Sequence, residues 1–166
     1  MYAINCLMIY SIFGFILESC VYKIQKSHHF SGICYGPITY VYGFGVLALN
    51  LLDHYFFKRF HGNRVLKFFI IFIFSTLVLS LIEGIGGNIL YLVFHTRLWD
   101  YSKKPYHLGR YVCLELSLIW GTLGCIYLYL IKPKVDPLIK KIPSKVSFVV
   151  LGFELIDIIF VFLKKC

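Results

Sequence analysis

Glu83 is the residue whose position most favours chemistry, because it is the only acidic residue in the longest apolar stretch of the chain. That stretch runs from Leu66 to Phe94. A carboxylate at bilayer depth costs roughly 2.5 to 3.5 kcal/mol even on permissive insertion scales. Such residues usually face a protein interior or a water-filled cavity, so Glu83 predicts an intramembrane site.

Three other acids lie inside apolar runs and are further candidates for binding a substrate or an ion: Glu18, Glu154 and Asp157. Residues three or four apart share one face of a helix, which pairs Glu154 with Asp157 and places Ser11 and Gly14 beside Glu18. The functional hypothesis is a binding or proton-relay site. The structural alternative is that these acids only pin helices together, with no substrate.

The segment between the third and fourth apolar runs is a second candidate region. Its side chains suit a membrane interface, since Trp and Tyr prefer headgroup depth and an Asp can cap a turn or pair with a nearby cation. Its residues of interest are Trp99, Asp100, Tyr101, Ser102 and Arg110. Arg110 and Arg97 are the nearest candidate partners for a buried acid.

The elements that must position these residues are membrane-spanning helices. Of the 166 residues, 59% are hydrophobic and only 15% are charged. The apolar runs predict five helices at about Tyr2 to Gln25, Gly36 to Phe57, Val65 to His95, Tyr111 to Lys132, and Lys145 to Leu163. We therefore expect an all-α polytopic transmembrane helix bundle of about five spans, forming one integral membrane domain over residues 1–166.

The third run is long enough to raise an alternative. At 1.5 Å per residue its roughly thirty residues span about 45 Å, more than a hydrocarbon core of about 30 Å. Three glycines follow Glu83 before Asn88 and could break this helix, which would give six spans. A glycine-lined packing face within one helix is the favoured alternative.

The acids can be compared by their expected depth in the membrane, which follows from their positions along the five predicted spans. If the N-terminal side is side A, then Glu18, Glu83, Glu115 and Asp157 all fall in the half nearer side B. A polar cavity open to side B is expected, with the loops 26–35 and 96–110 at its mouth. The basic residues divide almost equally between the two sides, so the positive-inside rule does not orient the chain.

No metal, cofactor or nucleic acid is expected. The six cysteines have no C-x-x-C spacing, the adjacent His28 and His29 rarely converge on one ion, and no H-E-x-x-H motif is present. The net charge of +9 comes mostly from loops, where anionic lipid headgroups would meet it. An enzyme is not expected either, because there is no nucleophile elbow, zinc motif or phosphate-binding loop.

Several motifs together resemble a known bacterial family. They are Gly14-Phe15-Ile16-Leu17-Glu18, Ser31-Gly32-Ile33-Cys34-Tyr35-Gly36-Pro37, Tyr42-Gly43-Phe44-Gly45, Glu83, Leu98-Trp99-Asp100-Tyr101-Ser102, Arg110-Tyr111-Val112-Cys113-Leu114 and Ser117-Leu118-Ile119-Trp120-Gly121. In this order they resemble the permease-like membrane proteins called putative ABC-transporter type IV. Ser31 departs from the arginine usual in that family, and Tyr106-His107 from a common Phe-Asn.

The resemblance implies a permease-type subunit in the cell membrane, with no substrate named. The chain has no G-x-x-x-x-G-K-[ST] loop, so any P-loop ATPase must be a separate subunit. Five spans are few for a complete transport path, so a transporting form is expected to be a homo-oligomer or a hetero-complex. The alternative is a non-transporting membrane protein that binds lipid or a partner.

Overall fold

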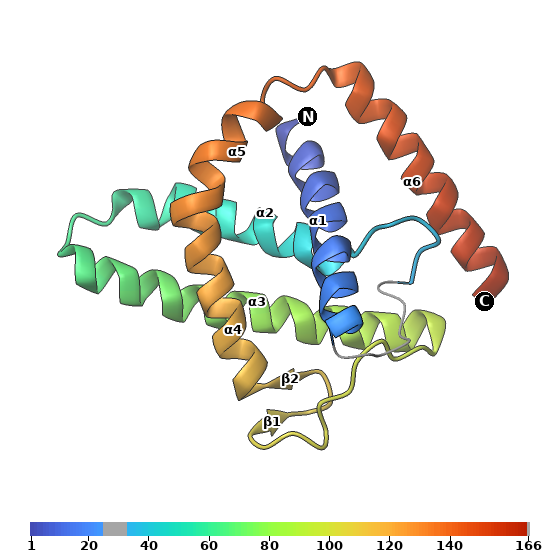
Figure 1. The fold of residues 1–166 in the computed structure, drawn as a ribbon, viewed down its shortest axis with the longest axis horizontal. Helices are drawn as coiled ribbons and strands as arrows, with labels where there is room; N and C mark the ends of the chain where they lie inside the picture. Colours follow the sequence, from blue (N-terminus) through green and yellow to red (C-terminus); the bar gives the residue numbers. More distant parts are fainter. Residues whose placement is uncertain (25–32, 166) are drawn as a thin grey trace.

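The computed structural model describes residues 1–24 and 33–165, and within that part of the chain the fold is helical (Figure 1). The α-helices are α1 (Tyr2–Ile24), α2 (Tyr40–Tyr55), α3 (Arg64–Phe94), α4 (Leu114–Ile126), α5 (Lys132–Ile139) and α6 (Ser144–Lys165). A 3-10 turn, η1 (Phe57–Arg59), follows α2, and a π-helical segment, η2 (Tyr127–Ile131), joins α4 to α5. The two short strands, β1 (His107–Leu108) and β2 (Val112–Cys113), form an antiparallel hairpin.

The helices pack mainly as α3 with α4 and α1 with α2, and α2 also lies along α3. In Figure 1 the α4–α5 rod and α1 cross the α2–α3 pair, and the hairpin lies at the start of α4. Helix α6 lies at the edge of the fold. The largest buried cluster contains Cys6, Tyr10, Leu49, Leu79, Tyr127 and Ile139. Four helices therefore meet at one core.

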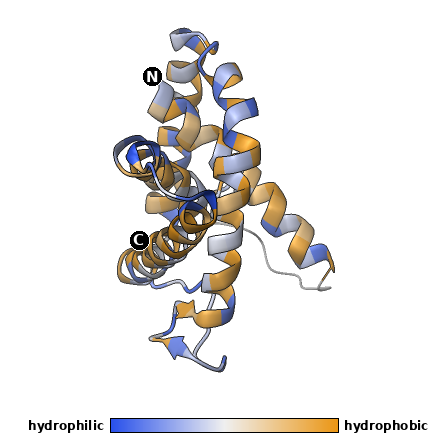
Figure 2. Ribbon diagram, turned by 90° about the vertical axis from the view of Figure 1, so that its left-hand side faces the viewer, coloured by the Kyte–Doolittle hydropathy of each residue, from blue (hydrophilic) through white to orange (hydrophobic). Residues whose placement is uncertain are grey.

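Within the described residues, four helical segments are long and apolar enough to cross a membrane: Tyr2–Ile24, Arg64–Phe94, Leu114–Ile139 and Ser144–Lys164. In Figure 2 hydrophobic colour runs along much of the helical ribbon, mixed with hydrophilic residues. Large apolar side chains such as Leu77, Phe153 and Leu163 are 62%, 68% and 78% exposed, as expected for a surface that lipid covers. The predicted all-α membrane bundle is confirmed.

The second helix is shorter than predicted. It begins at Tyr40 rather than at Gly36, and its 16 residues span about 24 Å, less than the hydrocarbon core. The preceding segment is held outside the helix, because the amides of Tyr35 and Gly36 donate to Asp157 on α6, at 3.1 and 2.9 Å. A distant carboxylate thus overrides the local helix-start signal of Gly36-Pro37.

The alternative of a broken third helix is wrong. Helix α3 is continuous from Arg64 to Phe94, with the Asn63 side chain accepting from the Val65 amide at its start. The glycines serve packing instead, because a Cβ at Gly87 would collide with the ring of Tyr111. His95 ends the helix in the left-handed conformation, with φ of 49°.

The fourth helix extends further than predicted, through Lys132 to Ile139. Pro133 lacks an amide hydrogen and its ring would clash with the preceding turn of a regular α-helix. The π-helical segment η2 ends two residues before it and widens the helix there, which lets the chain continue without a break. The basic segment 132–139 is therefore helix and not loop.

Small residues bring α3 and α4 into close contact. The Ser80 hydroxyl donates to Ser117 at 2.7 Å. A Cβ at Gly121 would meet Thr76, and one at Gly124 would meet Ser75. The small residues Ser117, Gly121 and Gly124 therefore lie against the polar face of α3, and this close packing brings Glu83 next to α4.

Candidate functional site

Glu83 is buried where α3, α4 and the loop before the hairpin meet, with 3% of its surface exposed. Its Oε1 accepts from the Tyr101 hydroxyl at 3.0 Å, and its Oε2 accepts from the Trp120 indole N–H at 2.8 Å. Among the described residues the ion pairs are made by other acids, namely Asp53, Asp100 and Glu115. Two uncharged donors, rather than a cation, hold this carboxylate.

Tyr101 reaches Glu83 from outside the membrane-spanning helices. Burial, followed by the proximity of Glu83, raises the pKa of the Tyr101 hydroxyl. The hydroxyl therefore stays protonated near neutral pH and can donate to the carboxylate. Tyr101, a residue of interest in the segment between the third and fourth apolar runs, is thus hydrogen-bonded directly to Glu83, the predicted intramembrane acid.

Glu18 completes this cluster from α1. The Tyr42 hydroxyl of α2 hydrogen-bonds to Glu18, and Glu18 lies within electrostatic range of Glu83. The ring of Tyr42 packs edge-on against Trp120, with centroids 5.2 Å apart. We call Glu18, Tyr42, Glu83, Tyr101 and Trp120 the Glu83 cluster. It draws one side chain from each of the first four helices and one from the loop.

Glu154 and Asp157 form a second group on α6. Asp157 accepts the two backbone amides that precede α2, and Glu154 Oε2 accepts from the Tyr40 hydroxyl at 3.5 Å. Glu154 is 4% exposed, and its Oε1 has no hydrogen-bond partner among the described residues. Among the described residues, the hydrogen bonds of this group run to the segment before α2 and to Tyr40 at the start of α2, whereas those of Glu83 run to α4 and the loop.

We call Trp99, Asp100, Tyr101, Ser102 and Arg110 the loop signature, and hydrogen bonds fold these residues into a turn. Asp100 Oδ1 accepts from the Ser102 amide at 2.9 Å, and its Oδ2 lies 3.6 Å from the Arg110 guanidinium. The Tyr101 amide donates to the Arg110 carbonyl at 2.7 Å. The ring of Trp99 packs edge-on against Tyr111, with centroids 6.3 Å apart. These contacts fix the backbone at Tyr101, which aims its side chain at Glu83.

The two arginines predicted as partners of Glu83 bind elsewhere, and the loops predicted to form the mouth of the cavity are only partly described. Arg110 pairs with Asp100, and the Arg97 guanidinium lies 4.4 Å from the centre of the Tyr91 ring, so neither arginine is bonded to Glu83. Glu115, grouped by depth with the buried acids, is exposed and pairs with Lys104 at 2.7 Å. Of the expected mouth loops, residues 26–32, including Ser31, lie outside the described residues.

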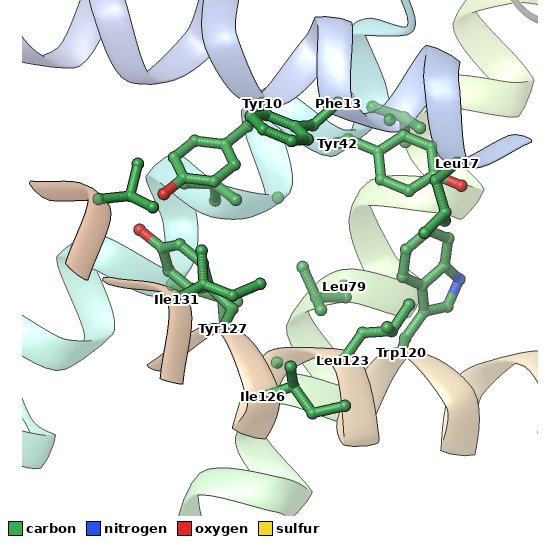
Figure 3. A pocket seen from close by; sticks show the side chains of 17 residues that line it. Tyr10, Phe13, Leu17, Tyr42, Leu79, Trp120, Leu123, Ile126, Tyr127 and Ile131 are labelled. Carbon is green, nitrogen blue, oxygen red and sulfur yellow. The ribbon is translucent and has the colours of Figure 1, made fainter. Parts of the chain in front are cut away.

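An apolar cavity of about 380 Å³ adjoins the cluster inside the bundle. Figure 3 shows Trp120 and Tyr42 at one end and the edge-on pair Tyr10 and Tyr127 at the other, with aliphatic side chains between them. The Trp120 nitrogen and the Tyr42 hydroxyl point away from the centre of the cavity (Figure 3). The two rings therefore separate the apolar cavity from the carboxylates.

Sequence reasoning did not select Trp120 or Tyr42 as site residues, although both occur in the motifs that carry the family resemblance. A spacing signal was available for Trp120, which lies three residues after Ser117 and one before Gly121, on the face that packs against α3. No group of three or more metal-ligating side chains comes together among the described residues.

The fold, with four described helical segments long and apolar enough to cross a membrane, is that of a helical membrane protein. The family model described as "Putative ABC-transporter type IV" matches residues 5–163, nearly the whole chain, and the chain belongs to that family. No curated protein and no solved structure matches it significantly. The resemblance read from the sequence motifs is thereby confirmed.

Proposed function

We propose that this chain is the multi-pass, permease-type subunit of an ABC-like transport system in the cell membrane, with the Glu83 cluster as its intramembrane site. Family membership supports a membrane transport component. The observation that carries the site is Glu83 itself, a buried carboxylate held by two neutral donors. Such an acid is costly in a membrane and needs a compensating role.

In this proposal Glu83 and Glu18 bind a cation or exchange protons as the cavity changes its access. Two carboxylates within electrostatic range of each other repel when both are charged, and a shared cation or proton relieves that repulsion. Tyr101 and Trp120 release or retain Glu83 as the site fills and empties. Glu154 and Asp157 are a secondary candidate site.

The energy source would be a separate ATPase subunit, because the chain lacks a phosphate-binding loop. Two basic segments, one around Lys58 to Lys67 and the other along α5, offer surfaces for that subunit. A homo-oligomer or a hetero-complex would supply the further helices that a transport path needs. No catalytic role is proposed for the chain.

The deciding experiment is purification of the tagged protein in mild detergent from its native cell, with mass spectrometry of stoichiometric partners. We expect an ABC-type ATPase to co-purify with the wild type, Glu83→Gln and Glu115→Gln alike. ATP hydrolysis by the complex should fall about tenfold in Glu83→Gln, a typical size for coupling between sites. Glu115→Gln, a matched change at an exposed acid, should leave it unchanged.

The second candidate function is a non-transporting membrane protein that binds lipid or a partner. Asp157 favours it, because its bonds to two backbone amides are those of an acid that holds elements together. Recovery of the protein with no ATPase, and a Glu83→Gln variant that loses only stability, would support this candidate and contradict the first.

A further inference from the structure

A second hollow, of about 970 Å³, lies outside the bundle core between α3, the start of α4 and the hairpin. One wall is the outer face of α3, where Leu77, Leu81 and Ile85 are 62%, 61% and 49% exposed. We call this hollow the α3 groove. Its lining includes neither Glu83 nor Trp120, so it is distinct from the Glu83 cluster.

The α3 groove is cationic at one end. Arg97 and Arg110 both line it, and both are close enough to Asp100 to influence that carboxylate electrostatically. The Arg97 guanidinium is steadied over the Tyr91 ring at 4.4 Å. Two arginines against one aspartate leave a net positive charge, and the described lining residues include no acid.

The dimensions of the groove match one leaflet of a bilayer. Its apolar α3 residues extend from Leu77 to Ile85, which is about 12 Å at 1.5 Å per residue. Half of a hydrocarbon core is about 15 Å. The apolar wall therefore covers most of the depth of one leaflet, and the arginines come after the end of α3, where headgroups lie.

We propose that the α3 groove binds an anionic phospholipid of the surrounding bilayer. Its phosphate lies between Arg97 and Arg110, because guanidinium groups match phosphate oxygens in charge and geometry. One acyl chain lies along Leu77, Leu81 and Ile85. A free phosphate ion has no apolar part to contact that wall. A zwitterionic headgroup would bring a positive charge next to Arg97 and Arg110, which already make the site positive.

The test is native mass spectrometry of delipidated protein titrated with phosphatidylglycerol or phosphatidylcholine. Wild type should bind phosphatidylglycerol about tenfold more tightly, the size expected for a small net charge near the headgroups. Arg97→Gln with Arg110→Gln should abolish the preference. Since Arg110 also pairs with Asp100, Arg97→Gln alone is the second variant and should reduce the preference without removing that pair.

Two controls separate the groove from a general charge effect. Lys103→Gln removes a cation from the same loop at a residue that does not line the groove, and it should leave the preference unchanged. Leu81→Trp fills the apolar wall without altering charge and should weaken binding of both lipids. The same spectra report whether the protein is a monomer or a dimer.

Three results would overturn the proposal. One is a phosphatidylglycerol preference that survives Arg97→Gln with Arg110→Gln, or that Lys103→Gln lowers equally. Another is full competition by inorganic phosphate, which would make the site a headgroup pocket alone. The third is a dimer that Leu81→Trp dissociates, which would mean that a second copy of the chain covers the groove.

Discussion

Glu83 and Asp157 are both acids in apolar helices, yet they are held by different kinds of donor. Glu83 accepts from two side chains, the Tyr101 hydroxyl and the Trp120 indole. Asp157 accepts from the backbone amides of Tyr35 and Gly36. Side-chain donors can rotate away when a ligand or a proton arrives, whereas backbone donors fix the chain. We therefore predict that Glu83 switches between states and that Asp157 anchors the chain.

The largest loss of stability is expected where the anchor is removed. Asp157→Ala deletes two hydrogen bonds to a carboxylate, each worth about 1.5 to 3 kcal/mol, and frees α6 from the segment before α2. We expect the free energy of unfolding to fall by about 3 kcal/mol. Denaturant titration in mild detergent, followed by circular dichroism, would measure it.

The matched control for this anchor is Glu115→Ala, at an exposed acid paired with one lysine. Exposed pairs contribute little, so its stability should change by less than about 1 kcal/mol. Equal losses in the two variants would mean that Asp157 anchors nothing, and the distinction between the two buried acids would fail.

A smaller effect is expected at the donors of Glu83. Tyr101→Phe and Trp120→Phe each remove one hydrogen bond and leave the other, which should cost about 1 to 3 kcal/mol because the acceptor is a carboxylate. Thermal unfolding of both variants in the same detergent would give these values. The loss of stability in Tyr101→Phe should lie at the lower end of this range, because phenylalanine keeps the six-membered ring in place, whereas Trp120→Phe replaces the indole with a smaller ring.

The same pair of variants sharpens the assignment of switching. If the donors gate Glu83, each variant should also alter ATP hydrolysis by the purified complex, while Asp157→Asn should not. If Tyr101 and Trp120 have only a structural role, the two variants should lower the stability of the protein and leave ATP hydrolysis unchanged. Unaltered hydrolysis in both donor variants would therefore place Glu83 in the same class as Asp157.

Much of this arrangement follows from the sequence, for physical reasons that particular residues make clear. Apolar runs predicted the membrane helices because burial of backbone polar groups in lipid allows few alternatives. Helical period alone places Ser117, Gly121 and Gly124 on one face of α4, and the structure shows that this face packs on α3.

The errors occur where distant contacts override local signals. Gly36-Pro37 resembles a helix start, but Asp157, 121 residues away, captures the Gly36 amide. The glycines after Glu83 allowed a break as an alternative, but the Tyr111 ring packs at Gly87, as the favoured prediction of a packing face requires. The division of the acids into two groups depends likewise on which helices are neighbours, and no spacing within one helix contains that information.

The smallest expected effect concerns the turn that aims Tyr101 at Glu83. Hydrogen bonds from Ser102, and then the nearby Arg110, hold the pKa of Asp100 below its ordinary value of 3.8. Because the folded pKa is the lower one, the turn gains stability from ionised Asp100 above about pH 4 and loses it as pH falls through the folded pKa. The Ser102 amide should therefore gain protection from hydrogen exchange between acidic and neutral pH, after correction for its intrinsic exchange rate.

In Asp100→Asn that gain in protection should disappear, because the asparagine side chain does not titrate. If the gain persists in the variant, another group holds the turn, and the link from the loop signature to Glu83 does not run through Asp100.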